Sequence, residues 1–224
     1  MPTLLAFGDQ LLQGASLTIL IAAASMLAGC LVGLVGAAMK LSGRQPLVGI
    51  AEAYTTVIRG LPDLLVIFIF YFGGMTALGK LFGHYVDVDP FAAGACALAI
   101  IFGAYATEIF RGAIIAVPKG QREGAQSLGL SKAVMFMLVV LPQAARHALP
   151  ALGNLSIVLL KETSLVSVIG LEELMRKSSL AAGATKEPFT FYAAAAVLYL
   201  CMTGTMTLAL HAAERRARRG AREA

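Results

Sequence analysis

The chain has 224 residues, of which 58% are hydrophobic and only 14% are charged, and it contains no tryptophan. Soluble globular domains carry about 25% charged residues, so this composition excludes that class and indicates a protein that crosses a membrane several times. The net charge of +5 is concentrated in a C-terminal tail, whose arginines are Arg215, Arg216, Arg218, Arg219 and Arg222. Because the tail directly follows an apolar run, we interpret it as an anchor against anionic lipid, and we expect no binding of nucleic acid.

Five apolar segments are long enough to cross about 30 Å of hydrocarbon. We expect an all-α fold in which residues 1–224 form a single transmembrane domain. The expected spans are 12–39, 51–79, 91–112, 133–160 and 188–213. Residues 1–14 contain no lysine or arginine, so they lack the basic region of a cleaved signal peptide.

The first span contains no charge and carries Gly29, Gly33 and Gly36. Gly29 and Gly33 lie four residues apart, a spacing that allows a neighbouring helix to approach closely. The second span contains the sequence Arg59-Gly60-Leu61-Pro62-Asp63. A charge or a proline inside a membrane is costly unless it faces protein or water. Two interpretations are open: Arg59 reaches the interface while Pro62 kinks the helix, or the segment lines a pathway.

The third span ends near Glu108, which could pair with a basic residue at the interface. The fourth span contains Pro142 and Pro150, so we expect it to be bent or broken. Residues 161–164 end this span, and a shorter amphipathic helix is expected within residues 165–183, which are too polar to cross lipid.

Residues 117–132 form a polar segment between the third and fourth spans. Pro118 suits the start of a helix and Gly129 suits the positive-φ residue that follows its end. We therefore predict a short amphipathic surface helix here, because so polar a helix cannot lie in hydrocarbon. From the residues alone, it is either a solvated loop or an element that docks on another protein.

The distribution of basic residues predicts the orientation in the membrane. With the C-terminus in the cytoplasm, the N-terminus lies outside and most of the basic residues lie inside, as the positive-inside rule requires. Besides the tail, the residues placed inside are Lys40, Arg44, Lys119, Arg122 and Lys132. The polar segment then lies in the cytoplasm, where a soluble partner can reach it.

Common catalytic motifs are absent from the sequence. It holds no Gly-x-x-x-x-Gly-Lys-Ser/Thr phosphate loop, no His-Glu-x-x-His zinc helix and no Gly-x-Ser-x-Gly nucleophile elbow. We therefore predict that the chain is not an enzyme and binds no metal or cofactor. If it moves a solute against a gradient, the energy must come from ATP hydrolysed by a separate subunit.

The polar segment resembles the EAA loop of ABC importer permeases. That loop has a Glu, two small residues, three spacers, a Gly, nine spacers, an aliphatic residue, one spacer and Leu-Pro. The matching residues here are Glu123, Gly124, Ala125, Gly129, Val139, Leu141 and Pro142. Gly124 replaces the first alanine, and Val139 replaces the usual isoleucine.

Other stretches are similar to the polar amino-acid permeases of the same class. Residues 54–64 resemble their "RG-x-P" segment, and residues 14–18 and 162–171 also match, so that the resemblance covers nearly the whole chain. Asp63, directly after Pro62, resembles the Q-type subunit of histidine/lysine/arginine and octopine/nopaline importers. The paired M-type subunit usually reads Arg-Gly-Thr-Pro-Leu at this place.

The resemblance implies the membrane half of a type I ABC importer in the bacterial inner membrane. Its expected partners are a second, M-type permease subunit, two ATPase subunits that bind ATP and Mg²⁺, a periplasmic amino-acid-binding protein and the lipid bilayer. The expected cargo is a polar, basic amino acid such as arginine, lysine, histidine or ornithine, or an opine. Alternatives are the same fold importing glutamine or methionine, a membrane scaffold that moves nothing, and an intramembrane enzyme.

The resemblance also makes the polar segment a coupling helix that docks on the ATPase. The expected coupling residues are Arg122, Glu123, Ala125, Gln126, Ser127 and Gly129. In the pathway, an amino acid needs a donor for its carboxylate and an acceptor for its ammonium group. Candidates near helix breaks are Arg59, Asp63, Glu108, Asn154, Glu162, Thr163 and Ser164. For each of these, the alternative is a structural ion pair or a helix cap.

Overall fold

The computed structural model describes residues 2–84 and 86–218, and every regular element in these ranges is helical. The α-helices are α1 (Pro2–Ala6), α2 (Gly8–Leu41), α3 (Gln45–Gly60), α4 (Asp63–Phe82), α5 (Pro90–Ile115), α6 (Lys119–Ser127), α7 (Lys132–Met135), α8 (Leu141–Glu162), α9 (Leu174–Thr185) and α10 (Pro188–Arg218). A π-helix, η1 (Phe136–Val140), and a 3-10 helix, η2 (Thr163–Ile169), complete the chain. The tail residues Arg219 and Arg222 lie outside the described residues.

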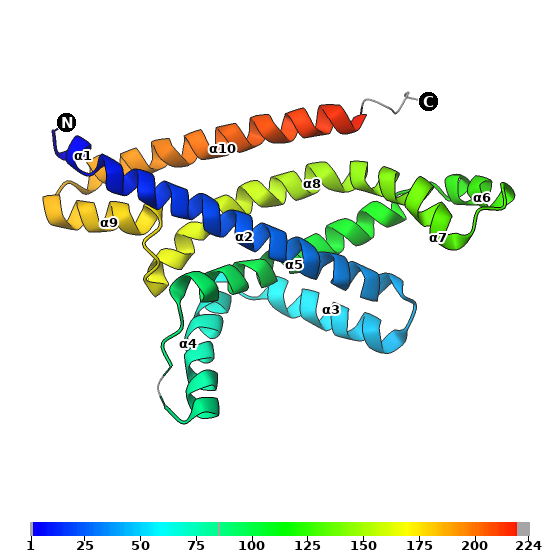
Figure 1. The fold of residues 1–224 in the computed structure, drawn as a ribbon, viewed down its shortest axis with the longest axis horizontal. Coiled ribbons are helices and arrows are strands. Elements are labelled where there is room, and N and C mark those ends of the chain that lie inside the picture. The colour runs from blue at the N-terminus through cyan, green and yellow to red at the C-terminus, as the bar shows by residue number, and fades with distance from the viewer. Residues whose placement is uncertain (1, 85, 219–224) are drawn as a thin grey trace.

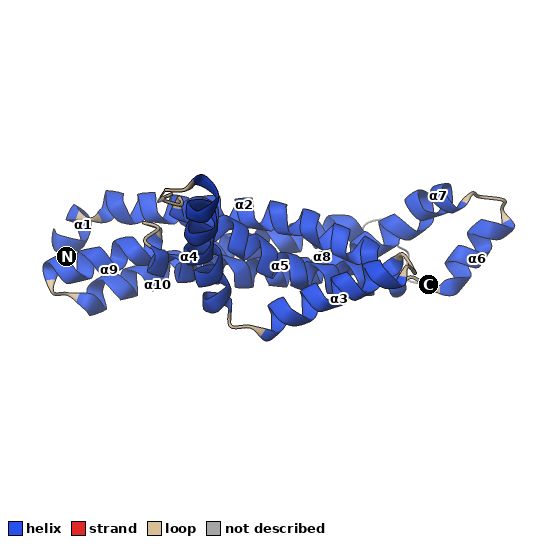
Figure 2. Cartoon of the chain, turned by 90° about the horizontal axis from the view of Figure 1, so that it is seen from below, coloured by secondary structure: helices blue, strands red, loops and turns tan. Residues whose placement is uncertain are grey.

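Five helical segments are long and apolar enough to cross a membrane, which confirms the expected all-α fold with five spans. They are Gly8–Leu41, Asp63–Phe82, Pro90–Ile115, Lys132–Ile169 and Pro188–Arg216. Helices α2, α5, α8 and α10 run along the long axis of the molecule, whereas α4 projects away from them (Figure 1). The N-terminus lies at one end of this bundle, and α6, α7 and the end of α10 lie at the other (Figures 1 and 2).

Helices α2 and α5 form the centre of the bundle because small residues let their backbones approach. A Cβ atom built on Gly33 would lie only 2.6 Å from the Cβ of Ala106, and one on Gly29 would lie 2.8 Å from the ring of Phe102. Gly36 is in similarly close contact with Thr107. The close helix contact predicted from the glycine spacing is therefore confirmed.

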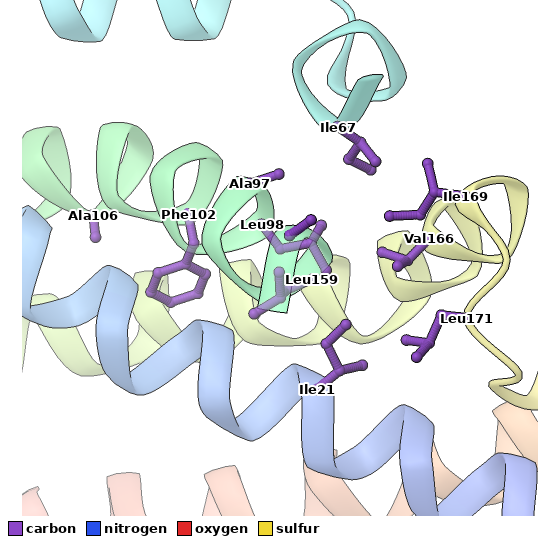
Figure 3. Packing of buried hydrophobic residues seen from close by; sticks show 11 residues of the cluster. Ile21, Ile67, Ala97, Leu98, Phe102, Ala106, Leu159, Val166, Ile169 and Leu171 are labelled. Carbon is purple, nitrogen blue, oxygen red and sulfur yellow. The ribbon is translucent and has the colours of Figure 1, made fainter. Parts of the chain in front are cut away.

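The main apolar core lies where α2, α4, α5, α8 and η2 meet (Figure 3). Its members include Ile21 from α2, Ile67 from α4, Phe102 from α5, Leu159 from α8 and Val166 from η2, each at most 2% exposed. This core holds the first turns of α4 and the 3-10 helix η2 against the central pair α2 and α5.

The segment expected to form one span over residues 51–79 forms two helices, and only α4 is a candidate span. Between α3 and α4, Leu61 is extended with φ −98° and ψ 148°, and Pro62 follows with ψ 133°. Proline disfavours the helical conformation in the residue before it, so α3 ends at Gly60 and a new helix starts at Asp63. The proline thus separates two helices instead of kinking one.

The fourth span is distorted but continuous from Lys132 to Ile169. Pro142 has no N–H to donate to the carbonyl group four residues earlier, and the preceding turn is the π-helix η1, a common way to absorb such a defect. Pro150 lies inside α8 without ending it. The helix therefore runs past residue 160, where we expected it to stop, and tightens into η2.

Candidate functional site

Helix α6 stands at one end of the molecule and has the predicted start and stop. Pro118 lies directly before its first residue in an extended conformation, and Gly129 has φ +74°. The Gly129 N–H donates to the Gln126 carbonyl at 2.9 Å, and the Leu130 N–H donates to the Ala125 carbonyl at 3.2 Å. This pair of bonds is the Schellman cap, which a glycine with positive φ forms readily. The predicted role of Gly129 as a helix stop is confirmed.

Two of the expected coupling residues hold α6 against the rest of the chain. Arg122 Nη2 donates to the carbonyl of Ile114 at 2.6 Å, in the last turn of α5. A positive charge is favourable at this negative end of a helix. Ala125 is only 4% exposed. Both residues therefore fix the angle of α6 and face the chain itself.

The outward face of α6 carries the remaining expected residues, Glu123, Gln126 and Ser127, all of which are exposed together with Gly129. Beside them Leu128, which lay outside the expected coupling residues, is 81% exposed. Ala125 and Leu128 lie three residues apart, a spacing that places two residues on neighbouring positions of one helix face, but Ala125 is buried and Leu128 is not. Leu128 is the residue at which the helix ends before the Gly129 turn. Leu128 and the polar side chains beside it therefore form an exposed surface at this end of the molecule.

Glu108 lies in an ion cluster within the bundle. Its carboxylate accepts hydrogen bonds from Lys40 Nζ at 2.5 Å and from Arg111 Nε at 3.0 Å. Lys40 also donates to Thr55 Oγ1 at 2.8 Å. The cluster joins α2, α3 and α5. Glu108 therefore forms the kind of structural ion pair that was the alternative to a role in the pathway. Nearby, the guanidinium of Arg59 lies 5.2 Å from the ring centroid of Tyr105, a cation–π contact between α3 and α5.

The structure brings Asp63 and Glu162 together. Asp63 begins α4 directly after the break at Pro62, and Glu162 is the last residue of α8 before it tightens into η2. Their carboxyl groups lie close enough to interact, and both side chains are partly buried. Two acids at two adjoining helix ends therefore form a carboxyl pair within membrane-spanning segments.

The last three pathway candidates have different surroundings. Asn154 is exposed on α8. The hydroxyl of Thr163 is buried and donates to the Leu160 carbonyl at 2.8 Å, and that of Ser164 donates to the Lys161 carbonyl at 2.8 Å. Both hydroxyls therefore bind the backbone of the preceding turn, as local caps do. Among the described residues, no cluster of His, Cys, Asp and Glu has the form of a metal site.

A buried carboxylate that the expected site residues did not include lies at the opposite end from α6. Glu173 precedes α9 and accepts hydrogen bonds from the Arg176 N–H at 2.8 Å and the Tyr199 hydroxyl at 3.0 Å. Burial raises the pKa of Glu173 above its usual range. Next to it, the ammonium of Lys177 lowers the pKa of the exposed Glu172.

Five spans with a polar helix standing out at one end are the architecture expected of the membrane component of a transporter. Residues 25–219 match the family described as "Binding-protein-dependent transport system inner membrane component", and the chain belongs to this family. It is thus an inner-membrane permease subunit of an ABC transporter whose other components include an ATPase and a solute-binding protein.

Similar proteins span the whole chain. It is 44% identical over 222 residues to the nopaline transport system permease NocQ of Agrobacterium fabrum, covering 96% of this chain and 94% of that one. It is 41% identical to the histidine/lysine/arginine/ornithine permease HisQ of Salmonella typhimurium, covering 94% of each. A chain of an amino acid ABC transporter crystallised with histidines superposes with a TM-score of 0.85 at 38% identity, covering 95% of this chain and 96% of that one. The methionine transporter MetNI shares the fold, with a TM-score of 0.77 at 16% identity over 95% of this chain and 98% of that one.

Proposed function

We propose that this chain is the permease subunit of an ATP-driven importer for basic amino acids or opines. The relatives that are 41–44% identical over nearly their whole length are permeases for nopaline, octopine and histidine/lysine/arginine/ornithine. Of these solutes, all but histidine carry a permanently cationic guanidinium or ammonium group besides the α-amino group or its derivative, and the imidazole of histidine becomes cationic on protonation. The observation that carries the substrate class is the carboxyl pair of Asp63 and Glu162.

The carboxyl pair suits a cationic side chain for an electrostatic reason. Two acids that face each other in a poorly solvated place repel when both are ionised, and a guanidinium or ammonium group between them relieves that repulsion. A neutral amino acid provides no such compensation at its side chain. The other predicted contributors to the pathway are Arg59, Glu108, Asn154, Thr163 and Ser164. Of these, Glu108 already forms ion pairs with Lys40 and Arg111.

The test is uptake of arginine and of a neutral amino acid by the complete transporter in proteoliposomes. In Asp63→Asn and Glu162→Gln, we expect arginine uptake to fall roughly tenfold, because a charge-assisted hydrogen bond is lost. Uptake of the neutral solute should change far less. Glu52→Gln is the matched control, since Glu52 is an exposed acid on α3. An equal loss for both solutes would remove the basis for the substrate class.

We further propose that α6 is the coupling helix that docks on the ATPase. Its proposed docking surface consists of the exposed residues Glu123, Gln126, Ser127, Leu128 and Gly129. The Schellman cap and the Arg122–Ile114 bond would make α6 a rigid lever, so that closure of two ATP- and Mg²⁺-loaded ATPase subunits moves α5 and α8. This is rigid-body gating with a short helix as the mechanical link.

Leu128→Ala tests the docking surface, because its exposed side chain contributes nothing to the fold of this chain. We expect binding of the ATPase to weaken about tenfold, as for an anchor residue at an interface, and uptake to uncouple from ATP hydrolysis. Glu123→Ala should act in the same direction with a smaller effect. Asp9→Asn, an exposed change at the other end of the molecule, is the control for ATPase binding. Unchanged binding and uptake in both α6 variants would contradict the proposal.

The proposed assembly pairs this chain with a homologous M-type permease, which would cover the apolar surface of α3 and α4 beside the carboxyl pair. Leu65, Ile69 and Phe72 on α4 are each more than 40% exposed. The same proposal puts α6 and the end of α10 in the cytoplasm and the N-terminus outside, where the periplasmic amino-acid-binding protein docks. Copurification with mass identification of the bound subunits tests the pairing, and recovery of this chain alone as the permease would overturn it.

A further inference from the structure

An apolar groove of about 340 Å³ runs between α2, α8 and α10. Its walls include Ile19 and Met26 from α2, Leu159 from α8, and Met202, Met206 and Ala209 from α10. Two hydroxyl residues also line it, but both are satisfied within their own helices. Ser156 Oγ donates to the Leu152 carbonyl at 2.8 Å, and Thr205 Oγ1 lies 2.8 Å from the Met202 carbonyl. The groove therefore offers an apolar surface.

The groove lies on a side of the bundle where hydrocarbon is available. Only 6% of the most apolar window of α10 is buried inside the chain. Leu200 and Leu208, which flank the groove residues in the sequence, are each 71% exposed. A surface of this kind within a membrane span is accessible to lipid tails. Unlike the rest of α10, the groove has walls on three helices and can hold a flexible chain from several sides.

A basic end adjoins the groove on α10. Arg216 follows Ala209 by seven residues, which places it two turns along the same face and about 10 Å farther along the axis. Arg215 and His211 line a neighbouring hollow with Arg216, and both arginines are exposed. Glu214 is the acid nearest to them in sequence, and it projects from α10 about 200° around the helix from Arg216. Among the described residues, neither Arg215 nor Arg216 forms an ion pair, so positive charge predominates at this end of the groove.

We propose that this groove and its basic end form a binding site for an anionic phospholipid. One acyl chain lies between α2, α8 and α10, and the phosphate is bound by Arg215 and Arg216. The distance fits, because Met202 to Arg216 covers about 21 Å of helix, which is half of the hydrocarbon thickness plus the headgroup region. Basic residues at such a position attract anionic headgroups, and the apolar groove adds a chain-binding surface that exposed arginines alone lack.

Native mass spectrometry of the complete transporter in detergent tests the site with two probes, phosphatidylglycerol and phosphatidylcholine. The intact protein should retain phosphatidylglycerol preferentially. In the double variant Arg215→Gln and Arg216→Gln, we expect its affinity to fall about thirty-fold, which corresponds to the loss of two basic contacts near the membrane surface. The affinity for phosphatidylcholine should stay nearly unchanged. Equal retention of both lipids by the intact protein would overturn the proposal.

A second change tests the groove itself. Ala209→Phe fills it and should reduce retention of both lipids, whereas Ala28→Phe, an exposed position on α2 outside the groove, should not. Arg44→Gln is the control for charge, since Arg44 is exposed in the loop before α3. A photo-crosslinking amino acid at position 209 in membranes separates the possible occupants: a lipid adduct supports the proposal, and a crosslink to the second permease subunit overturns it.

Discussion

Helices α5 and α10 are equally apolar but have opposite surroundings. Their most apolar windows have the same mean hydropathy of 1.7, yet 61% of the α5 window is buried inside the chain and only 6% of the α10 window. Both contain small residues, so composition does not separate them. The difference comes from their neighbours: α5 meets the glycines of α2, whereas the Cβ position of Gly204 on α10 faces open space. In a membrane, hydropathy determines which segment spans, and close packing determines which span lies at the centre.

Helix α10 is held mainly through its first half. Phe191 is fully buried, and its ring meets that of Phe7 edge-on with centroids 5.4 Å apart. Tyr199 donates to the buried carboxylate of Glu173. Farther along, Leu210 is in close contact with Gly153 of α8. The comparison therefore predicts that substitutions in α5 affect stability strongly, and that α10 is sensitive only near its anchors.

The largest expected effect is that of Leu98→Ala on α5. Leu98 is fully buried in the main core, so its truncation should lower the free energy of unfolding by about 3 kcal/mol through lost packing and the cavity left behind. Leu200→Ala on α10 is the matched change at a 71% exposed position and should cost less than about 0.5 kcal/mol. Thermal unfolding of both variants in the same detergent measures the difference, and similar losses would refute the comparison.

Gly33→Leu is expected to have the next largest effect. Its Cβ would lie 2.6 Å from that of Ala106, so α2 and α5 would have to move apart at a cost of about 2 kcal/mol. Gly204→Leu, with no atom near its Cβ position, should be neutral or slightly stabilising, because leucine is the better helix former. Unfolding temperatures of the two variants check this, and a stable Gly33→Leu protein would show that α2 and α5 are not tightly packed.

A smaller, pH-dependent effect is expected at the anchor of α10. Because the pKa of Glu173 is raised on folding, the folded state binds its proton more tightly than the unfolded state. Its contribution to stability is therefore present below the ordinary pKa of glutamate and is lost as the pH rises through the folded-state value. Glu173→Gln should remove this dependence, while its single amide oxygen accepts only part of the hydrogen bonds that the two carboxylate oxygens receive from the Arg176 N–H and the Tyr199 hydroxyl.

Unfolding temperatures measured across the mildly acidic range test the Glu173 prediction. Glu172→Gln is the control, because the pKa of Glu172 is lowered by Lys177. Its small contribution has the opposite sign, being present above the ordinary pKa and lost as the pH falls through the folded-state value. If wild type and Glu173→Gln had parallel stability profiles, Glu173 would not be the titrating anchor of α10.

Several parts of the molecule could be predicted because they depend on local chemistry. Pro118 and Gly129 mark the bounds of α6 through the backbone conformations that they favour or permit. The glycine spacing in α2 indicated a close helix contact. Length and apolar composition predicted five spans. The second was predicted to begin at residue 51, but Pro62 disfavours a helical conformation at Leu61, so that two separate helices form there.

Other parts depend on contacts between residues far apart in sequence. Ala125 and Leu128 share a face by helical spacing, but the rest of the chain covers Ala125 and leaves Leu128 exposed. Asp63 and Glu162 are separated by nearly 100 residues, and only the packing of α4 against η2 joins them. Nothing in the sequence distinguished Glu108 from the other pathway candidates. In the structure, however, its carboxylate forms an ion pair with Lys40 from α2.

The amino-acid sequence by itself determined that this protein is a helical membrane permease with a polar helix between two spans. Hydropathy, proline and glycine act within a few residues and need no partner. Only the tertiary structure decided which spans lie at the centre, which acids are paired and which face of α10 is grooved. These features arise from steric fit and charge contacts between distant segments, and equally apolar helices provide no local signal for them.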